Sequence, residues 1–322
     1  MNTKLIVYRL TAIFAVLFFT QCGEDQESEH IKVADDELWT VVSRNLEINS
    51  IEGDYVFTEG PVWNDAGYFL FSDIPDNKIY KYIPEQGVEV FTDSSFNSNG
   101  LAYAPNGDLL ACEHGARSIS QYDNNKNRTQ LVGQYGEKRL NSPNDLAVHS
   151  SGAIYFTDPP WGLEGLDDDP AKELAFNGLY LLKDSSLLLQ DSSMFRPNGL
   201  ALSPDEKYLY VGETQKGEKP KKLWYRYEIG DSLRLTNRMI FAEAPNSEIE
   251  GSPDGMKTDK DGNLFCTGPG GILIFNDEGK YLGLIRLPKL PSNCAFGGKN
   301  NELLMVTARD KVYILSNIKP KS

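Results

Sequence analysis

One short sequence pattern recurs six times along this chain and constrains its fold more than any other feature. In each copy a polar residue precedes a short apolar segment, a polar turn and a second β-rich run. Successive copies start 40, 45, 54, 56 and 39 residues apart, at Glu59, Asn99, Asn144, Asn198, Asp254 and Asn293. A period of about 40–50 residues built from short strands and polar turns is typical of a β-propeller with one blade per repeat. We therefore predict an all-β fold, a six-bladed propeller with four antiparallel strands in each blade.

The repeats also indicate the domain organisation. They fill residues 59–308 without a break, and we interpret residues 38–322 as a single domain. A closed ring must join its first and last blades, and the strand-like segment 38–44 has no partner in its own repeat. We expect this segment, together with its neighbours, to complete the last blade beside the C-terminal strands and to remove an open sheet edge.

Two connections between expected strands are longer than the others, residues 159–177 and 214–222. Loops of a propeller lie at the ends of its central channel. These two segments are therefore candidates for the rim or lid of a pocket, the alternative being plain surface loops.

The N-terminal segment resembles a bacterial lipoprotein signal. Residues 1–21 contain a short basic region with Lys4 and Arg9 and then an apolar run at 10–19, which is too short for a comfortable membrane span. Cys22 follows at once and is the expected site of lipidation, although Gln21 departs from the usual small residue before that cysteine. The alternatives are an ordinary cleaved signal and an uncleaved anchor. We expect residues 22–37 to form a flexible acidic tether, and the protein to be exported to the periplasm or cell surface, touching a membrane only through its lipid.

Charge and cysteine content exclude several classes of function. The net charge of −14 argues against a nucleic-acid partner, whose phosphates favour a basic surface. Beyond Cys22, an odd number of cysteines is scattered one to a repeat, which fits neither a disulfide framework nor a zinc motif. We interpret these as small buried hydrophobic residues: Cys112, Cys266 and Cys294. The 3 histidines are too few and too scattered for a histidine-based metal site.

The first residues of the repeats form a candidate metal site. Radial symmetry places them at one height around the channel, where they supply two carboxylates, Glu59 and Asp254, and four asparagine carboxamides. Ca²⁺ prefers about six to eight oxygen ligands and accepts such a mixture of charged and neutral donors. The ring therefore predicts one divalent cation on the axis. For any single Asn, the alternative is a residue that only caps a turn.

A second set of acids recurs at the end of the second expected strand. Asp73, Glu113 and Asp158 each lie fourteen residues after the first residue of their repeat, and Glu213 lies fifteen after Asn198. We interpret these acids as caps of strand ends, with metal contact as the alternative.

Several long segments resemble one known family. They include EGPVW (59–63), ACEHGARSI (111–119), LNSPNDLAV (140–148), YFTDPPWG (155–162), RPNGLALSPDEKYLYV (196–211) and SPDGMKTDKDGNLFCTGPGG (252–271). Over nearly all of residues 40–318 the chain resembles the gluconolactonase family, the senescence-marker-protein or regucalcin-like six-bladed propellers, and in particular its bacterial branch.

The resemblance implies a metal site at the same positions as the ring. It implies that Glu59, Asn198 and Asp254 hold a divalent metal and that Asn144 contacts either the metal or the substrate. We expect Ca²⁺, with Zn²⁺, Mg²⁺ and Mn²⁺ as alternatives. One position departs from the family: the animal branch has an arginine two residues before its matching asparagine, whereas this chain has Ser142. The sugar contacts of that arginine therefore do not transfer to this chain.

The resemblance also implies the reaction, which is hydrolysis of a small-molecule sugar lactone to the aldonic acid. The metal would polarise the lactone carbonyl, and Asp254 would act as the general base that activates water. Asn144 and His114 complete the expected catalytic set, His114 as a substrate contact or proton relay; its alternative is a turn histidine held by the backbone. Two other functions remain open, a hydrolase of another ester or a phosphotriester, and a non-catalytic surface-anchored binding propeller with structural Ca²⁺.

Overall fold

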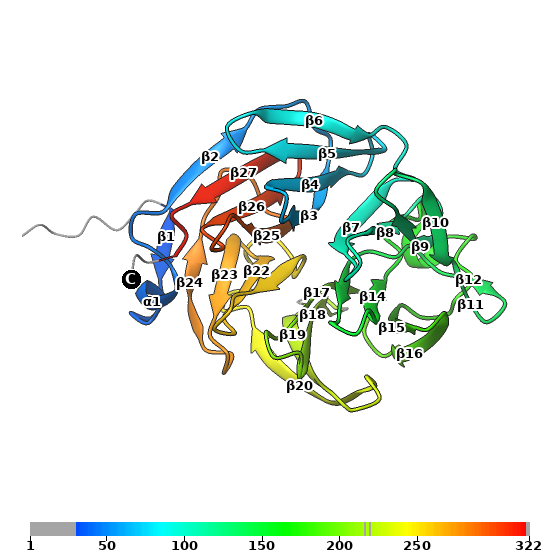
Figure 1. Cartoon of the computed structure of the whole chain (residues 1–322). Coiled ribbons are helices and arrows are strands. Elements are labelled where there is room, and N and C mark those ends of the chain that lie inside the picture. Colours follow the sequence, from blue (N-terminus) through cyan, green and yellow to red (C-terminus); the bar gives the residue numbers. More distant parts are fainter. Residues whose placement is uncertain (1–29, 216, 219, 320–322) are drawn as a thin grey trace, which may run out of the picture.

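The computed structural model describes residues 30–319 apart from residues 216 and 219, and its fold is the predicted six-bladed propeller. Figure 1 shows the six sheets arranged around a ring. Each sheet is antiparallel, and its strands follow one another outward from the centre in chain order except where the ring closes. The predicted signal segment 1–21 and Cys22 lie outside the described residues. Within the described part of the chain, no helix has both the length and the apolar character needed to cross a bilayer.

Blades 1 to 4 are each built from four consecutive strands. Blade 1 comprises β3 (Thr58–Asn64), β4 (Tyr68–Asp73), β5 (Lys78–Ile83) and β6 (Gly87–Thr92). Blade 2 comprises β7 (Ser98–Tyr103), β8 (Leu109–Glu113), β9 (Ser118–Tyr122) and β10 (Arg128–Val132). Blade 3 comprises β13 (Leu146–Val148), β14 (Ile154–Asp158), β15 (Gly178–Lys183) and β16 (Ser186–Asp191). Blade 4 comprises β17 (Pro197–Leu202), β18 (Tyr208–Thr214), β19 (Lys222–Ile229) and β20 (Leu235–Glu243).

Blades 5 and 6 each take a strand from the N-terminal segment. Blade 5 comprises β21 (Met256–Thr258), β22 (Leu264–Gly268), β23 (Gly271–Phe275) and β24 (Tyr281–Ile285), with β1 (Ile31–Val33) added at its edge. Blade 6 comprises β25 (Asn293–Gly297), β26 (Leu303–Ala308), β27 (Lys311–Ser316) and β2 (Glu47–Ile51) as its outermost strand.

The ring is therefore closed by an N-terminal strand, as predicted. The prediction that residues 38–44 form this strand was wrong. Residues 38–44 begin with the short helix α1 (Leu38–Val41), and the closing strand is β2, which follows it and pairs with β27. Leu38 and Val41 lie three residues apart, so a helical turn buries both against blades 5 and 6.

The domain also begins earlier than expected. β1 pairs with β24, and the Nζ of Lys280 bonds to Asp35 at 2.7 Å and to Glu37 at 3.1 Å. We expected a flexible tether over residues 22–37. Residues 30–37, the part of this range that the structure describes, instead pack against blade 5.

The core consists of six clusters of buried hydrophobic side chains, each between two successive blades. Alternation along a strand divides its side chains between two clusters. In β4, Phe69 and Phe71 pack toward blade 6, whereas Leu70 packs toward blade 2. The three cysteines of the repeats are free and buried, as predicted. Packing on both faces makes the blades rigid supports for the residues at the channel.

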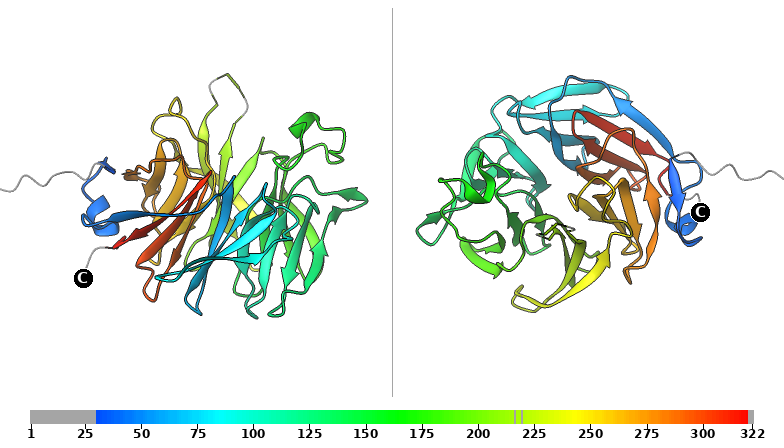
Figure 2. Two further views of the ribbon diagram at one scale, coloured as in Figure 1. Left: turned by 90° about the horizontal axis from the view of Figure 1, so that it is seen from above. Right: turned by 180° about the vertical axis from the view of Figure 1, so that it is seen from behind.

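The two long connections rise from the same end of the propeller (Figure 2, left). The first, residues 159–177, contains the 3₁₀ turn η1 (Leu166–Asp168), and the second forms the end of the β18–β19 hairpin. A small separate hairpin, β11 (Gln134–Tyr135) and β12 (Lys138–Arg139), precedes blade 3.

Candidate active site

The first residues of five repeats line one pocket at the end of the channel. This pocket has a volume of about 410 Å³, and its polar lining consists of Glu59, Asn99, His114, Asn144, Asn198, Ser252 and Asp254. Every site residue predicted for the repeats is therefore in it: Glu59, His114, Asn144, Asn198 and Asp254. Asn99, which belongs to the ring but was not predicted as a ligand, is in it as well.

Close approach of neighbouring inner strands brings these residues together. In four repeats the residue after the ring residue is glycine: Gly60, Gly100, Gly199 and Gly255. A Cβ at Gly60 would lie 2.0 Å from the carbonyl oxygen of Asn99, and one at Gly199 would lie 2.2 Å from that of Asp254. Gly60 also has φ of +54°, which a larger residue adopts only with strain. Glycine at these positions lets each ring residue lie against the next.

Hydroxyl groups of the second strands also hold ring residues in place. Ser72 Oγ donates to the carbonyl oxygen of Asn99 at 2.8 Å, and Thr157 Oγ1 donates to that of Asn198 at 2.8 Å. Each bond joins a blade to the next one, so the positions of the ring residues depend on the assembled propeller.

Asp145 is a buried carboxylate beside the site that the sequence analysis missed. It occupies the position that is glycine in four other repeats and is 3% exposed. Its Oδ1 accepts a hydrogen bond from the backbone N–H of Leu146 at 2.9 Å. Comparison of the six repeats at this position would have revealed it, because a carboxylate stands where four of the other five repeats have glycine.

The sixth ring residue, Asn293, does not line the pocket but supports it. Its Nδ2 donates to Oε2 of Glu59 at 3.1 Å and lies 3.4 Å from Oδ2 of Asp145. Asn293 therefore orients the acid of the first repeat from the last blade.

Three buried carboxylates lie in or beside the pocket: Glu59, Asp145 and Asp254. Burial raises the pKa of Glu59 and of Asp145, and burial raises that of Asp254 well above its ordinary value. The charges of Glu59 and Asp145 raise the pKa of Asp254 further. Lys257 has the opposite effect and lowers the pKa of Glu59 and Asp145. If all three acids are ionised, one lysine leaves an excess of negative charge that a divalent cation would balance.

The oxygen atoms available in the pocket fit a hard cation. Oδ1 of Asn99 and Oδ1 of Asn198 are buried and have no hydrogen-bond partner, which is costly for a polar atom unless a ligand satisfies it. The amide of Asn144 and the carboxylates of Glu59 and Asp254 line the same pocket, so it holds the mixed charged and neutral oxygen donors that Ca²⁺ accepts. Over residues 30–319 without 216 and 219, no cluster of three or more His, Cys, Asp and Glu side chains is arranged to hold a metal. The site is therefore one in which asparagine oxygens would have to complete the ligand set.

His114 lies at the wall of the pocket and is nearly inaccessible. It is 7% exposed, and burial lowers its pKa to about 4, so the imidazole is neutral at pH 7. Its Nε2 lies 3.2 Å from Nδ2 of Asn99. An amide nitrogen only donates, so in this arrangement Nε2 accepts and the ring proton lies on Nδ1.

Three of the four acids at the ends of the second strands bind backbone N–H groups of the segments that lead into their own blades. Asp73 accepts hydrogen bonds from the backbone N–H groups of Val56 and Phe57 at 2.8 and 3.0 Å. Asp158 and Glu213 accept from the backbone N–H groups of Asn141 and Phe195, respectively. Each acid thus binds the residue three positions before the ring residue of its own repeat.

Glu113 differs from the other three acids. It accepts hydrogen bonds from Ser118, Ser120 and Tyr122 and forms an ion pair with Arg128. It therefore joins the strands within blade 2.

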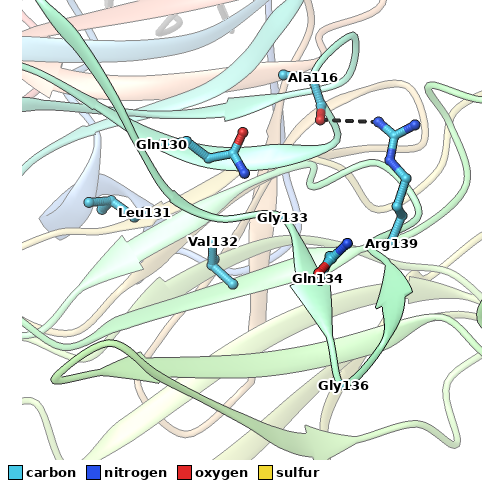
Figure 3. A pocket seen from close by; sticks show the side chains of 8 residues that line it. All are labelled: Ala116, Gln130, Leu131, Val132, Gly133, Gln134, Gly136 and Arg139. Carbon is cyan, nitrogen blue, oxygen red and sulfur yellow. Dashed lines mark hydrogen bonds between the residues drawn. The ribbon is translucent and has the colours of Figure 1, made fainter.

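A larger hollow lies away from this site, at the outer edge of blade 2. Figure 3 shows Gln130, Gln134 and Arg139 around it, and its volume is about 580 Å³. The guanidinium of Arg139 bonds to the carbonyl oxygen of Ala116 at 3.4 Å. None of the first residues of the repeats lines this hollow, whereas five of them line the pocket described above. That pocket is therefore the candidate active site.

Comparison with known proteins agrees with the fold and shows the family. Residues 57–309 match the family model described as the SMP-30/gluconolactonase/LRE-like region. The gluconolactonase of Zymomonas mobilis is 39% identical over 299 residues, which cover 86% of this chain and 83% of that protein. A solved gluconolactonase structure from Xanthomonas campestris has a TM-score of 0.80 at 32% identity and covers 89% of this chain and 94% of its own.

A more distant structure shares the fold alone. Regucalcin of Agrobacterium tumefaciens, described as a calcium-binding protein, has a TM-score of 0.69 at 17% identity, covering 84% of this chain and 95% of its own. The family model spans more than half of the chain and the Zymomonas protein most of it. The chain therefore belongs to the SMP-30/gluconolactonase/LRE-like family.

Proposed function

We propose that this protein is a metal-dependent lactonase that hydrolyses a sugar lactone to the aldonic acid. Membership of the family makes it a hydrolase of carboxylic esters, the class of reaction that gluconolactonases and lactonases catalyse. The observation that carries the proposal is that Glu59, Asn144, Asn198 and Asp254 line one pocket.

We assign the metal to these four residues, with Ca²⁺ as the expected ion. The donors are all oxygens, and two of them are neutral amides. Ca²⁺ prefers such oxygen donors, whereas Zn²⁺ is usually bound by nitrogen and sulfur. When bound there, a divalent cation would supply a Lewis acid that polarises the lactone carbonyl.

The side chains of the protein provide the remaining steps. The carboxylate of Asp254 takes a proton from the attacking water, which adds to the carbonyl carbon. The same residue returns the proton to the ring oxygen as the C–O bond breaks, so no proton is gained or lost until the product acid ionises. His114 is neutral and forms part of the pocket wall. Its contact with Asn99 would hold the amide of that residue in a fixed position beside the substrate.

The test is proton release from glucono-1,5-lactone by the purified protein with Ca²⁺ added, after subtraction of spontaneous hydrolysis. A lactonase shows a saturable rate that a chelator abolishes and Ca²⁺ restores. A protein that binds Ca²⁺ but gives no rate above background with any lactone would be a binding propeller and would overturn the proposal.

We further propose that the protein is exported and lipid-anchored at Cys22, on the basis of the basic and apolar segments before this residue. The lipid would be its membrane contact, and the lactone its partner.

A further inference from the structure

Part of the wall of the active-site pocket is apolar. Phe57, Ile74 and Pro75 contribute from blade 1, and Trp161 contributes from the connection 159–177. Phe57 and Trp161 are 37% and 41% exposed, so both rings present apolar surface in the pocket. A substrate with its carbonyl at the ring residues would place the rest of its body against this wall.

A smaller cavity continues the pocket behind Trp161. Its volume is about 210 Å³, and it shares Trp161, Asn198 and Ser252 with the main pocket. Phe195 and Pro253 add apolar surface to it, and Thr214 adds one buried hydroxyl group that has no hydrogen-bond partner. The side cavity therefore offers room for a group attached to the ring of the substrate.

The cation at the side cavity is already engaged. Arg196 Nε donates to Oδ2 of Asp167 at 2.8 Å, and the two form an ion pair. The guanidinium also lies 4.6 Å from the ring centroid of Trp161 and 4.9 Å from that of Phe195. Because its charge is balanced and its faces lie on aromatic rings, this arginine favours an uncharged group in the cavity.

Ser142 holds Trp161 in this position. Its Oγ donates to the carbonyl oxygen of Pro159 at 2.7 Å and accepts from the backbone N–H of Gly162 at 2.9 Å, so it spans the turn that carries Trp161. The side chain of Ser142 is fully buried. A Cβ at Gly162 would lie 2.7 Å from Cβ of His114 and 2.8 Å from that of Ser142, so the turn packs directly on the pocket wall.

The remaining polar groups are few for a hydroxyl-rich substrate. Apart from the four assigned metal-binding residues, the polar lining is Asn99, His114 and Ser252. Nδ2 of Asn99 already bonds to His114, which leaves its Oδ1 as the one group of this amide without a partner. Hydroxyl groups placed against Phe57 or Trp161 would lose water without gaining a partner, which costs free energy.

We propose that the site takes, in addition to sugar lactones, lactones whose ring carries an alkyl or aryl group. This group lies on Trp161 and enters the side cavity. Ser142 is the positioning residue for that part of the wall. This inference rests on the proposed lactonase function and adds a substrate class to it.

The first test compares δ-octalactone with δ-valerolactone, which have the same ring with and without a propyl group. The full-length protein with Ca²⁺ is expected to prefer δ-octalactone by at least about tenfold in kcat/KM, through KM, since one methylene in an apolar pocket is worth about tenfold or more. Hydrolysis of both lactones with equal kcat/KM would overturn this inference and leave the lactonase function intact.

The second test uses variants of the wall. Trp161→Ala is expected to bring the ratio of the two kcat/KM values close to one, whereas Ile240→Ala, on the outer strand of blade 4, leaves it unchanged. Ser142→Ala should lower the ratio by raising KM for δ-octalactone more than for δ-valerolactone, with Ser151→Ala at an exposed turn as its control. A parallel loss of kcat for both lactones at a constant ratio would overturn the positioning role of Ser142.

A binding measurement separates this inference from the proposed function. 2-Propyltetrahydropyran keeps the ring and the propyl group but has no carbonyl to hydrolyse. Binding of this compound is measured by calorimetry. Binding to the wild type that is at least tenfold weaker in Trp161→Ala supports the subsite. If such binding is found but no lactone is hydrolysed, only the proposed lactonase function is wrong. Absence of binding to the wild type would overturn the subsite whatever the activity.

Discussion

Asn293 Nδ2 donates a hydrogen bond to Oε2 of Glu59 at 3.1 Å, across 234 residues of sequence and across the seam that joins blade 6 to blade 1. The two residues begin the last and first repeats, yet they have different roles. Glu59 faces the pocket, whereas Asn293 lies beside it and fixes the carboxylate. Closure of the ring and assembly of the site are therefore coupled at this contact.

Asn293→Ala should weaken Ca²⁺ binding without removing a ligand. Loss of a residue that orients a metal ligand typically costs about 10–100-fold in affinity, and we expect a change in this range. The kcat at saturating Ca²⁺ should return to near the wild-type value. Calorimetry and lactone hydrolysis at several Ca²⁺ concentrations measure both quantities, with Asn300→Ala, an exposed position of the same blade, as control. Unchanged affinity would show that this hydrogen bond does not orient Glu59.

Glu59→Gln should weaken Ca²⁺ binding by more than about 100-fold and abolish most activity, because it removes a charge from the metal site. Glu213→Gln is the matched control. Its carboxylate accepts from the backbone N–H of Phe195, and an amide oxygen can accept the same bond. Calcium titration and lactone hydrolysis compare the two variants. If Glu213→Gln lost activity as completely as Glu59→Gln, the second set of acids would belong to the site.

Asp254→Asn separates the two roles proposed for this residue. The substitution keeps the size and one oxygen but removes the charge and nearly all basicity. We expect kcat to stay about 10²–10⁴-fold lower at saturating Ca²⁺, as for loss of a general base. Turnover measured as a function of Ca²⁺ decides this. Full recovery of kcat at high Ca²⁺ would mean that Asp254 only binds the metal.

Stability should depend on pH through Asp158. Burial raises the pKa of Asp158 to about 7, and its Oδ1 has no hydrogen-bond partner. In the folded protein the carboxyl therefore stays protonated up to about pH 7, whereas in the unfolded chain it loses its proton near pH 4. The unfolded state binds fewer protons in this window, so this group lowers the free energy of unfolding as pH rises, by up to about 1.4 kcal/mol per pH unit.

Asp158→Asn should remove this contribution while keeping an acceptor for the N–H of Asn141. Urea unfolding of the variant and the wild type is measured between pH 4 and 8. The free energy of unfolding should fall less steeply with rising pH in Asp158→Asn than in the wild type. Asp65→Asn, in an exposed turn, serves as control. An identical pH dependence in the wild type and in Asp158→Asn would place the titration elsewhere.

Cys22→Ser tests the proposed export and anchor. Expressed at full length in a bacterial host, the wild type should incorporate labelled fatty acid and sediment with membranes. The variant should lose the label and shift to the soluble fraction, because a lipid chain is the proposed membrane contact. Equal labelling of both proteins would exclude Cys22 as the modified residue.

The sequence by itself determined the architecture and the residues of the ring. Six copies of one pattern dictated six blades, because each repeat can bury its apolar side chains only against its neighbours. Symmetry then placed the first residues of the six repeats in one ring, and five of them line one pocket: Glu59, Asn99, Asn144, Asn198 and Asp254. These conclusions depend on local patterns that every blade repeats, which is why sequence reasoning reaches them.

Only the tertiary structure decided the features that differ between the blades. It replaced segment 38–44 with β2 as the closing strand, because α1 in that segment buries Leu38 and Val41 against blades 5 and 6 while β2 pairs with β27. It showed that Asn293 supports the pocket while Asn99 lines it, although both are first residues of a repeat. It also brought Asp145, Ser142 and Trp161 to the site. Their positions follow from hydrogen bonds and close contacts between segments that the repeat pattern does not relate.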